Sequence, residues 1–332
     1  MTNQTVTLSD IQAAHERIGG KIARTPTVLS TSLSERLGVP VHLKLEHRQT
    51  TGSFKLRGAS NAIASLSADD KRRGVIAAST GNHGRALAHA AKLEGIRAVI
   101  CMSRLVPENK VSEIRRLGAD IRIVGKSQDD AQEEVDRLVA EEGLTMVPPF
   151  DHAAVIAGQG TVGLEMLDDV PDAATVVTPV SGGGLAAGVA AAVKGRKPSV
   201  KVIGVSMERG AAMKASLAAG KPVLVEEMET LADSLGGGVG LENRLTFSMV
   251  RDLLDGIVLV TEDEIAAGID HAYNEEREIV EGAGAVGIAA LLAGKIAAEG
   301  PIVILLSGRN IDMALHRRVI CGEAPLPGEG DI

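Results

Sequence analysis

A lysine at position 55 stands between two apolar residues, Phe54 and Leu56, directly after a Gly-Ser pair. A lysine in this setting is either a surface side chain that lays its aliphatic stem on apolar neighbours or an amine held in a partly dry pocket. Burial would lower the pKa of such an amine and make it a nucleophile. Most lysines are exposed, so the stretch taken alone favours the surface alternative.

Three consecutive glycines, Gly182, Gly183 and Gly184, lie between Ser181 and Leu185. A glycine run lets the backbone approach an anion closely, and a helix that begins near Leu185 would point its free N–H groups into the same space. These features predict a phosphate site, with a turn that packs a strand closely on a helix as the alternative.

The loop of residues 79–84 combines serine, threonine, asparagine and histidine with two glycines. Hydroxyl, amide and backbone N–H donors at a helix N-terminus suit a carboxylate. His83 is a candidate base, although a lone histidine near a helix start is more often structural. The histidines of the chain show neither H-x-x-x-H nor HExxH spacing, so the sequence predicts no zinc site.

The stretch from Gly282 to Gly287 matches the G-x-G-x-x-G pattern of dinucleotide-binding folds. That pattern requires a hydrophobic strand before it, whereas the preceding residues, HAYNEEREIVE, are charged and helix-like. We therefore do not expect NAD to bind there.

Short β-branched runs alternate with helical stretches rich in alanine and leucine. Seven runs are expected to be strands: VIAAS from Val75, AVICM from Ala98, DIRIV from Asp120, TVVTPV from Thr175, VKVIGV from Val200, IVLV from Ile257 and IVILLS from Ile302. The alternation predicts an α/β fold with parallel sheets covered by helices on both faces. Ligands in such sheets bind at the carboxyl ends of the strands.

Two glycine loops that each follow a strand and open a helix indicate two related halves. The pair Pro148-Pro149 marks the expected return from one half to the other, and the tail from Gly322 is expected to be a poorly ordered end. No stretch is left for a third, regulatory domain.

Composition narrows the class of protein. The chain has 332 residues, 45% of them hydrophobic, with no Trp, one Tyr and three Phe. Proteins that bind the phosphate backbone of nucleic acid need positive charge, whereas this chain has a net charge of -8, so nucleic acid is not an expected partner. Cys101 and Cys321 form no CxxC pair, and the N-terminus lacks a basic region followed by an apolar run. We expect a cytoplasmic protein with no membrane span.

Five motifs in order resemble those of fold-type II pyridoxal-phosphate enzymes, in the branch of threonine/serine dehydratases and serine racemases. They are LKLEHRQTTGSFKLRGA, ASTGNHGRALAHAAKLEGI, PFDHAAVIAGQGTVGLE, PVSGGGLAAG and LLSGRNID, and the resemblance covers roughly Leu8 to Asp312. It implies a two-domain fold similar to the tryptophan synthase β subunit. The expected division is a large cofactor-binding domain of residues 1–50 and 150–332 and a small substrate-side domain of residues 51–149.

The resemblance also implies roles for individual residues. Lys55 resembles the Schiff-base lysine, with Phe54 setting its amine against the cofactor ring, and Thr80 would share in catalysis from the opposite face. Further cofactor contacts are implied at Asn82 for the ring hydroxyl, at Ser181, Gly182, Gly183, Gly184 and Leu185 for the phosphate, at Ser307 for the pyridine nitrogen, and at Glu281. The implied substrate contacts are Ser79, Thr80, Gly81, His83 and Arg309.

The implied reaction is removal of the α-proton by the Lys55 amine, loss of a β-hydroxyl group, and release of a keto acid and ammonia. A serine hydroxyl at the ring nitrogen does not demand a protonated pyridinium, which favours prompt elimination. The expected substrate is a small β-hydroxy amino acid such as threonine, serine or hydroxyaspartate, handled by a catabolic homo-oligomer, a dimer or tetramer.

Three features depart from the branch. Lys214 occupies the position where metal-binding relatives carry Asp, six residues after Glu208, so an ammonium is expected to replace the metal ion. Arg309 interrupts the usual S-G-G-N, and the LADSLGGGVG segment from Leu231 differs from the threonine-enzyme pattern. Both look more like dehydratases of β-hydroxyaspartate or hydroxyectoine breakdown, where Arg309 would meet a second carboxylate.

Two rival hypotheses remain beside the ammonia-lyase. A serine-type racemase would use the Thr80 hydroxyl on the face opposite Lys55. A ligand-binding α/β protein would keep the loops without turnover. Formation of keto acid and the chirality of the remaining substrate separate the three.

Overall fold

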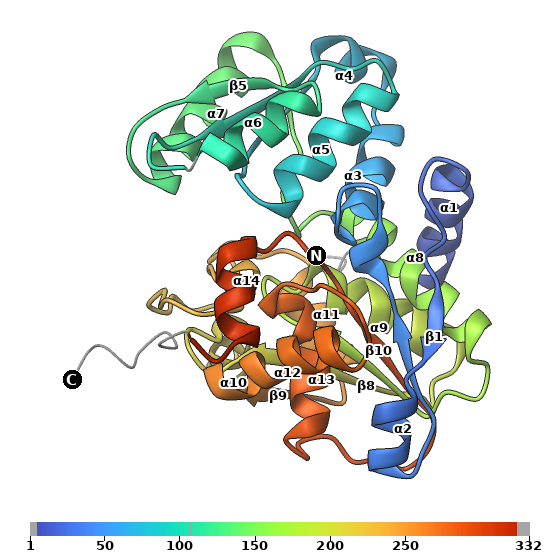
Figure 1. The fold of residues 1–332 in the computed structure, drawn as a ribbon. Helices are drawn as coiled ribbons and strands as arrows, with labels where there is room; N and C mark the ends of the chain where they lie inside the picture. Colours follow the sequence, from blue (N-terminus) through green and yellow to red (C-terminus); the bar gives the residue numbers. More distant parts are fainter. Residues whose placement is uncertain (1–4, 107, 324–332) are drawn as a thin grey trace.

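The structure is a computed structural model that describes residues 5–106 and 108–323 (Figure 1). Two separate sheets form the framework, one of six strands and one of four. In Figure 1 the four-stranded unit lies above the six-stranded one. Most of the tail that was expected to be poorly ordered, residues 324–332, lies outside the described residues.

The six-stranded sheet carries the β-branched runs of both chain ends. Its order is β1 (Thr27–Leu29), β2 (Val41–Lys44), β10 (Ile302–Leu305), β7 (Thr175–Pro179), β8 (Lys201–Met207) and β9 (Gly256–Val260). All pairings are parallel except that of the edge strand β1 with β2. The sheet therefore departs from the expected all-parallel arrangement at one edge, where a short connection returns the chain antiparallel.

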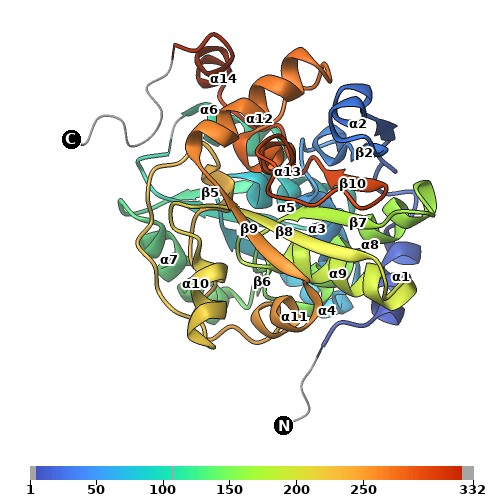
Figure 2. The ribbon, with the colours of Figure 1, turned by 90° about the horizontal axis from the view of Figure 1, so that it is seen from below.

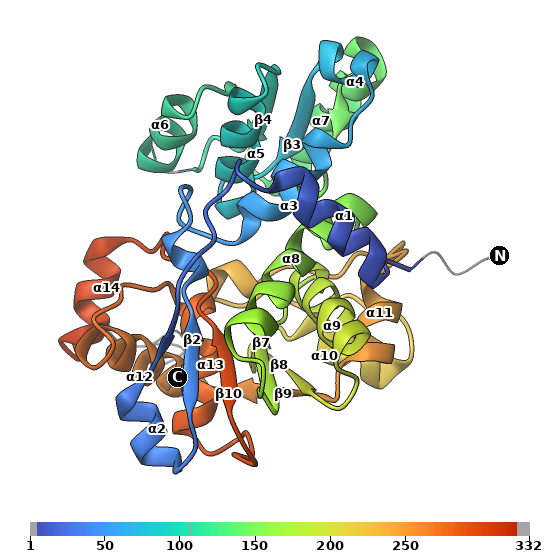
Figure 3. The same ribbon diagram turned by 90° about the vertical axis from the view of Figure 1, so that its right-hand side faces the viewer.

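Helices cover both faces of this sheet, because its central strands are apolar on both sides. Within β10, Ile302 and Ile304 pack into one core cluster and Val303 and Leu305 into another. The helices on the first side are α2 (Thr31–Leu37), α12 (Glu262–Asn274), α13 (Gly282–Leu292) and α14 (Met313–Ile320). Those on the other are α1 (Leu8–Ile18), α8 (Ala153–Asp169), α9 (Gly184–Arg196), α10 (Ala212–Ala219) and α11 (Thr246–Leu253). Figures 2 and 3 show the sheet between these two helical layers.

The four-stranded sheet is parallel throughout. Its order is β5 (Asp120–Ile123), β4 (Ala98–Met102), β3 (Val75–Ala78) and β6 (Thr145–Met146). One face packs on α3 (Lys55–Ala64), α5 (Asn82–Leu93) and α6 (Glu108–Arg116), and the other on α7 (Gln128–Glu142). The remaining helices of the described chain are α4 (Ala68–Arg73) and two short 3₁₀ turns, η1 (Glu46–Arg48) and η2 (Asp233–Leu235).

Helix α3 lies between the two units, because it packs on α5 of the small one and on α8 of the large one. Its first residue is Lys55, so the fold places that side chain at the junction.

The predicted fold class is confirmed, and all seven predicted strands are strands. The strands that the sequence did not indicate, β1, β2 and β6, span four residues or fewer. The division of the chain into domains at residues 51 and 149 stays a prediction. Gly282 to Gly287 lie within α13 rather than after a strand, and no described helix has the length and apolar character that crossing a bilayer requires.

Candidate active site

A cavity of about 240 Å³ opens where the strands of both sheets end. Loops that follow β3, β6, β7 and β10 contribute to it, as expected for ligand sites of parallel α/β sheets. Its lining residues are Phe54, Lys55, Ser79, Gly81, Asn82, His83, Pro149, Phe150, Pro179, Ser181, Gly182, Gly183, Gly184, Leu185, Ala186, Ser234, Leu235, Gly236, Glu281, Ala283 and Ser307.

Lys55 points its amine into this cavity. The side chain is half-buried, and Nζ donates a hydrogen bond of 2.8 Å to the carbonyl of Pro149. Burial lowers the pKa of Lys55 from 10.5 to about 8, and the nearby Glu281 carboxyl partly opposes that shift. A larger fraction of this amine is therefore unprotonated near neutral pH than is usual for lysine. The surface alternative for Lys55 does not describe this side chain.

The glycine loop lies at the N-terminus of α9, which begins at Gly184. A Cβ on Gly182 would lie 2.6 Å from the Phe150 ring, and one on Gly184 would lie 2.9 Å from Phe150. Gly183 has φ +90, a left-handed conformation that favours glycine. The three positions therefore have little room for a side chain, and the backbone of this loop lies at the positive end of the α9 dipole, a position that suits an anion.

A buried carboxyl lies on the opposite wall. Glu281 Oε1 accepts a hydrogen bond of 2.8 Å from the Asn82 side chain, and its Oε2 accepts one of 3.0 Å from the backbone N–H of Asn310. The Asn310 amide in turn donates to the Asn82 Oδ1 at 2.5 Å. Burial, together with the charge of Asp233, raises the pKa of Glu281 to about 7. A proton can therefore reside on this carboxyl near neutral pH.

Ser307 follows β10 directly and is buried. Its Oγ lies 3.4 Å from the Ala283 carbonyl, the sole side-chain bond that the structure records for it within the described residues. The hydroxyl therefore keeps capacity to donate to or accept from a ligand in the cavity.

The loop after β3 brings Ser79, Gly81, Asn82 and His83 to the cavity. His83 Nε2 lies 2.7 Å from the Val147 carbonyl, which accepts only, so Nε2 carries the proton. Burial and the charge of Lys55 lower the pKa of His83 to about 3. The histidine is therefore neutral, and its Nε2 is engaged with the backbone rather than available as a base.

Two predicted site residues do not line this cavity. Thr80 is half-buried, and the lining residues are its neighbours on either side. Arg309 is exposed and lines a different cavity with Arg85 and Arg277. Its backbone N–H donates to the Gly52 carbonyl at 2.9 Å, which holds the main chain beside the loop that precedes Lys55.

Comparison with known proteins places the chain in a family. The model of the family described as pyridoxal-phosphate dependent enzyme matches residues 18–308. The chain belongs to the pyridoxal-phosphate dependent enzymes. The predicted family, the enzymatic character and the dependence on pyridoxal phosphate are confirmed by this match and by the relatives named next.

Several relatives are similar over nearly their whole length. A Sinorhizobium fredii protein, provisionally named a threonine dehydratase, is 67% identical to this chain over 96% of each chain. The L-threonine ammonia-lyase of Thermotoga maritima is 44% identical, over 95% of this chain and 78% of that protein. Among solved structures, serine racemase from Dictyostelium discoideum has a TM-score of 0.87 and 33% identity, and covers 93% of this chain and 99% of its own.

The residues around the cavity of this enzyme fit the cofactor. The aldehyde carbon of pyridoxal phosphate needs an amine of lowered pKa to attack it, and Lys55 offers such an amine. A phosphate needs a cradle of backbone donors, and the loop at residues 181–184 is built so tightly that a Cβ on Gly182 would meet Phe150. A ring with a hydroxyl and a nitrogen needs polar partners, and Asn82 and Ser307 both line this cavity.

Part of the cavity wall of this enzyme has no clear signal in the sequence. Pro149 and Phe150 line the cavity, Phe150 behind the glycine loop and Pro149 as the acceptor for Lys55. The segment of residues 234–236 closes it from the side of η2. The Pro-Pro pair and the glycine-rich LADSLGGGVG run were visible as turns, but no local pattern says that a turn faces a particular cavity.

The predicted pairing of Lys214 with Glu208 is wrong. The Lys214 amine donates to the Ile257 carbonyl at 3.0 Å, because α10 turns this exposed side chain toward β9. The ammonium near Glu208 is that of Lys295, 4.0 Å away. Within the described residues, no three His, Cys, Asp or Glu side chains form a group that could hold a metal ion.

Proposed function

We propose that this enzyme is an ammonia-lyase that eliminates water from a small β-hydroxy amino acid, such as L-threonine or L-serine. Water then hydrolyses the released enamine, in its imine form, to a keto acid and ammonia. The observation that carries the proposal is the Lys55 amine, whose pKa is lowered to about 8, in one cavity with the glycine loop and Ser307. The resemblance of the chain to threonine dehydratases and an L-threonine ammonia-lyase supports the same reaction.

In this proposal the chain's own residues hold the cofactor at three points. The Lys55 amine provides the covalent attachment, backbone N–H groups of residues 181–185 bind the phosphate, and Ser307 bonds the ring nitrogen. Asn82 bonds the ring hydroxyl, and Phe54 and Glu281 complete the contacts. Pyridoxal phosphate supplies an electron sink for the α-carbon of a bound amino acid.

The substrate carboxylate would lie at the N-terminus of α5. Ser79, Gly81 and His83 line the cavity there, and the free N–H groups at the helix start attract a negative group. Lys55, once released by the substrate, takes the α-proton at Nζ, because its lowered pKa leaves a larger fraction of the amine unprotonated than is usual for lysine.

The charge of the cavity wall favours a substrate with one carboxylate. Lys55 is the single Lys or Arg among its lining residues, and Arg309 lines another cavity. A second carboxylate, as in hydroxyaspartate, would enter a partly buried space without a matching cation, which is costly. We therefore place threonine and serine ahead of hydroxyaspartate.

The test is a panel assay with the purified protein and pyridoxal phosphate. Ammonia and keto acid should form from L-threonine or L-serine, with at least tenfold lower kcat/KM for hydroxyaspartate, the scale of an unpaired buried charge. Absence of keto acid from every β-hydroxy amino acid tested would contradict the ammonia-lyase proposal and leave racemisation as the candidate reaction. A preference for hydroxyaspartate would instead restore the expectation that was built on Arg309.

Racemisation is a second candidate, supported by the 33% identity to a serine racemase over most of both chains. It needs a proton donor on the face opposite Lys55, the role predicted for the Thr80 hydroxyl. Chiral chromatography of unreacted L-serine is the measurement, since racemisation produces the D-enantiomer and elimination alone does not.

We further propose a homo-oligomer, a dimer or tetramer, in the cytoplasm. Tyr273, Ile279 and Met313 leave apolar surface exposed near the second cavity, a feature of protein contacts. Cys101 and Cys321 are free, as in a reducing compartment. Light scattering on the purified protein and fractionation of the source cells test the two statements separately.

A further inference from the structure

We propose that Arg57 is a positioning residue that fixes Lys55 relative to both ends of the cofactor site. Arg57 lies two residues after Lys55 in the first turn of α3, and its side chain is fully buried. It does not line the cavity, so it acts through Lys55 and touches neither cofactor nor substrate.

Every N–H donor of the guanidinium is used. Nε and one N–H group of Nη2 donate to Glu46 at 2.8 Å each, and Nη1 and Nη2 donate to Glu165, also at 2.8 Å each. The fifth donor reaches the Thr161 hydroxyl at 3.0 Å. Two carboxylates therefore clamp the planar group from two sides, which fixes its orientation as a single charge contact would not.

The two carboxylates are themselves held. Lys44 is fully buried and lies 2.7 Å from Glu165, and its amine also donates to the Thr25 carbonyl at 2.7 Å. The Thr25 hydroxyl donates to Glu46 at 2.5 Å. Arg57, Glu46, Glu165 and Lys44 form a buried charge cluster with equal numbers of positive and negative groups.

This buried charge cluster joins α3 to the strand β10, which precedes Ser307. Glu46 lies in η1, directly after β2, which pairs with β10. The main chain continues the connection, since the Phe54 N–H donates to the Ser307 carbonyl at 3.0 Å. The first turn of α3 is thereby fixed on the frame that presents the Ser307 hydroxyl.

The same cluster joins α3 to the helix pair behind the glycine loop. Glu165 lies on α8, which packs along α9, and α9 begins with the glycine loop. Arg57 therefore relates the Lys55 backbone to both the ring end and the phosphate end of the site. A shift of about 1 Å at a reacting group costs on the order of 10²-fold in rate.

Stability alone does not explain such a cluster. Replacing a buried ion pair by apolar side chains of similar volume is often neutral or stabilising, because desolvation offsets the attraction between the charges. The bidentate hydrogen bonds also set the orientation of the guanidinium, and with it that of the first turn of α3, which carries Lys55.

Arg57→Lys tests the proposal, because lysine keeps the charge and loses the fork. The first measurement uses the full-length apoprotein: acetic anhydride labelling of Lys55 as a function of pH, followed by mass spectrometry. In the unmodified chain the midpoint should lie near the pKa of about 8. In Arg57→Lys it should move by about one unit or more toward 10.5, as the amine leaves its dry position.

The second measurement is turnover, which rests on the proposed function. Arg57→Lys should lower kcat by about 10²-fold and change KM by less than about threefold. The labelling midpoint does not depend on the substrate. If the midpoint shifts in Arg57→Lys but neither this variant nor the unmodified protein turns over substrate, the proposed function is contradicted and the positioning role is supported.

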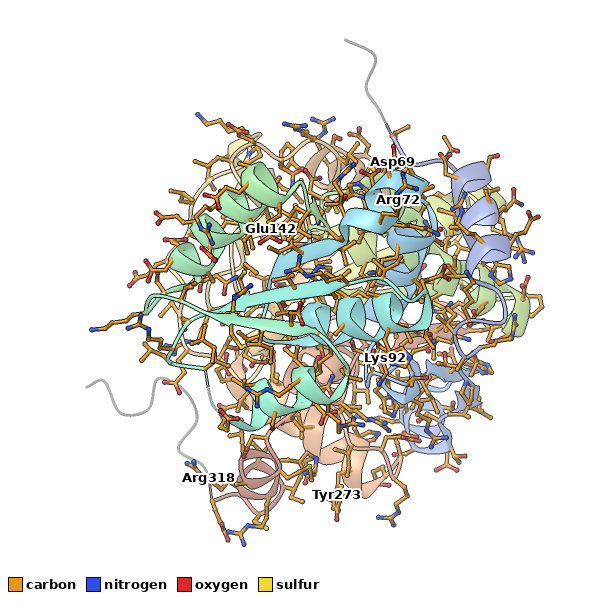
Figure 4. The ribbon with its side chains drawn as sticks, turned by 90° about the horizontal axis from the view of Figure 1, so that it is seen from above. Asp69, Arg72, Lys92, Glu142, Tyr273 and Arg318 are labelled. Carbon is orange, nitrogen blue, oxygen red and sulfur yellow. The ribbon has the colours of Figure 1, made fainter. Side chains whose placement is uncertain are left out.

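Two controls match the change. Arg97→Lys alters an exposed arginine that also bonds two carboxylates, Asp120 at 3.1 Å and Glu142 at 2.7 Å. Glu142 is labelled in Figure 4, which views the four-stranded unit from outside. Leu138→Ala removes a buried side chain on α7, far from Lys55. It controls for the loss of stability that Arg57→Lys is expected to cause. Neither control should move the Lys55 midpoint.

If Arg57→Lys is insoluble, Glu165→Gln provides the same test, because it weakens the hydrogen bonds that Arg57 donates to Glu165. Its midpoint should shift in the same direction by a smaller amount. An unchanged midpoint and kcat in a folded Arg57→Lys or Glu165→Gln, with a lowered Tm alone, would overturn the proposal and leave the cluster a structural element only.

Discussion

Two ionisable side chains in the cavity are shifted in opposite directions at the residue scale. Burial disfavours the charged form of each, so the pKa of Lys55 falls to about 8 and that of Glu281 rises to about 7. Near neutral pH each group can therefore exist in either protonation state. Such a pair is suited to moving a proton between a base and an acid within one small cavity.

Lys55→Ala should abolish covalent attachment of the cofactor and lower turnover by several orders of magnitude, because the nucleophile and the base are lost together. Absorbance of the bound cofactor and borohydride trapping measure the attachment, and ammonia release measures turnover. Lys126→Ala, at an exposed lysine, is the control. A borohydride-reducible, fully active Lys55→Ala protein would refute the role of Lys55.

The Glu281 carboxyl makes stability depend on pH. Its pKa is raised from 4.5 to about 7 in the folded chain, so the folded state holds a proton that the unfolded state has lost between these values. The free energy of unfolding should therefore fall as pH rises from 4.5 to 7 and level off above, by roughly 3 kcal/mol in total for this group.

Glu281→Gln isolates this contribution, because glutamine does not titrate. The difference in unfolding free energy, variant minus unmodified apoprotein, should rise between pH 4.5 and 7 and stay constant from 7 to 8.5. Urea unfolding at several pH values measures it, and any constant cost of the altered hydrogen bonds cancels from the slope. A difference independent of pH would mean that Glu281 ionises as an ordinary glutamate.

At the scale of elements, two helix N-termini supply most of the polar donors. Helix α5 begins at Asn82 and α9 at Gly184, each after a strand that ends at the cavity. Neither N-cap residue supplies a side-chain hydrogen bond, although the Ser79 Oγ accepts from the Gly84 N–H of α5 at 3.1 Å. The remaining N–H groups of a first helical turn lack intrahelical acceptors and suit an anion. The glycine loop can approach Phe150 only because its residues lack Cβ atoms.

Gly182→Ala should weaken cofactor binding by about tenfold or more and lower stability by about 1–3 kcal/mol, since its Cβ would lie 2.6 Å from the Phe150 ring. Absorbance titration of the apoprotein with pyridoxal phosphate measures the affinity. The double variant Gly182→Ala/Phe150→Leu should recover part of both losses. Gly256→Ala is the matched control, because no atom lies within 4 Å of its added Cβ. Equal effects of the two glycine changes would argue against a close-packed phosphate cradle.

At the scale of the whole molecule, the cavity exists only where the two sheet units meet. Lys55 comes from the helix between them, His83 from the small unit, and Ser181 and Ser307 from the large one. At Glu208, where the sequence predicted an ammonium in place of a metal ion, the neighbouring amine is that of Lys295 and not that of Lys214.

Activity should survive exhaustive chelation, because the Lys295 ammonium lies 4.0 Å from the Glu208 carboxylate and already offsets its charge. Turnover after dialysis against EDTA, compared with the same sample supplemented with magnesium or calcium, is the measurement. A strong loss that either ion reverses would show that a metal contributes after all.

The sequence by itself determined the local features of this protein. Strand runs with β-branched residues, glycine loops before helices and the Phe54-Lys55 pair each depend on neighbouring residues, whose propensities and steric limits act over a few positions. These patterns were enough to predict the fold class, and the family resemblance of five motifs added the cofactor and directed attention to Lys55 and the glycine loop, which the structure places in one cavity.

Tertiary structure decided which side chains share one space. Arg309 follows Ser307 by two positions, yet its side chain lines another cavity, and Lys214 turns toward Ile257 instead of Glu208. Phe150 and the Arg57 clamp were likewise hidden, because their partners lie far along the chain. Side-chain direction and burial depend on packing between distant segments, and the pKa values of Lys55 and Glu281 follow from that burial rather than from residue type.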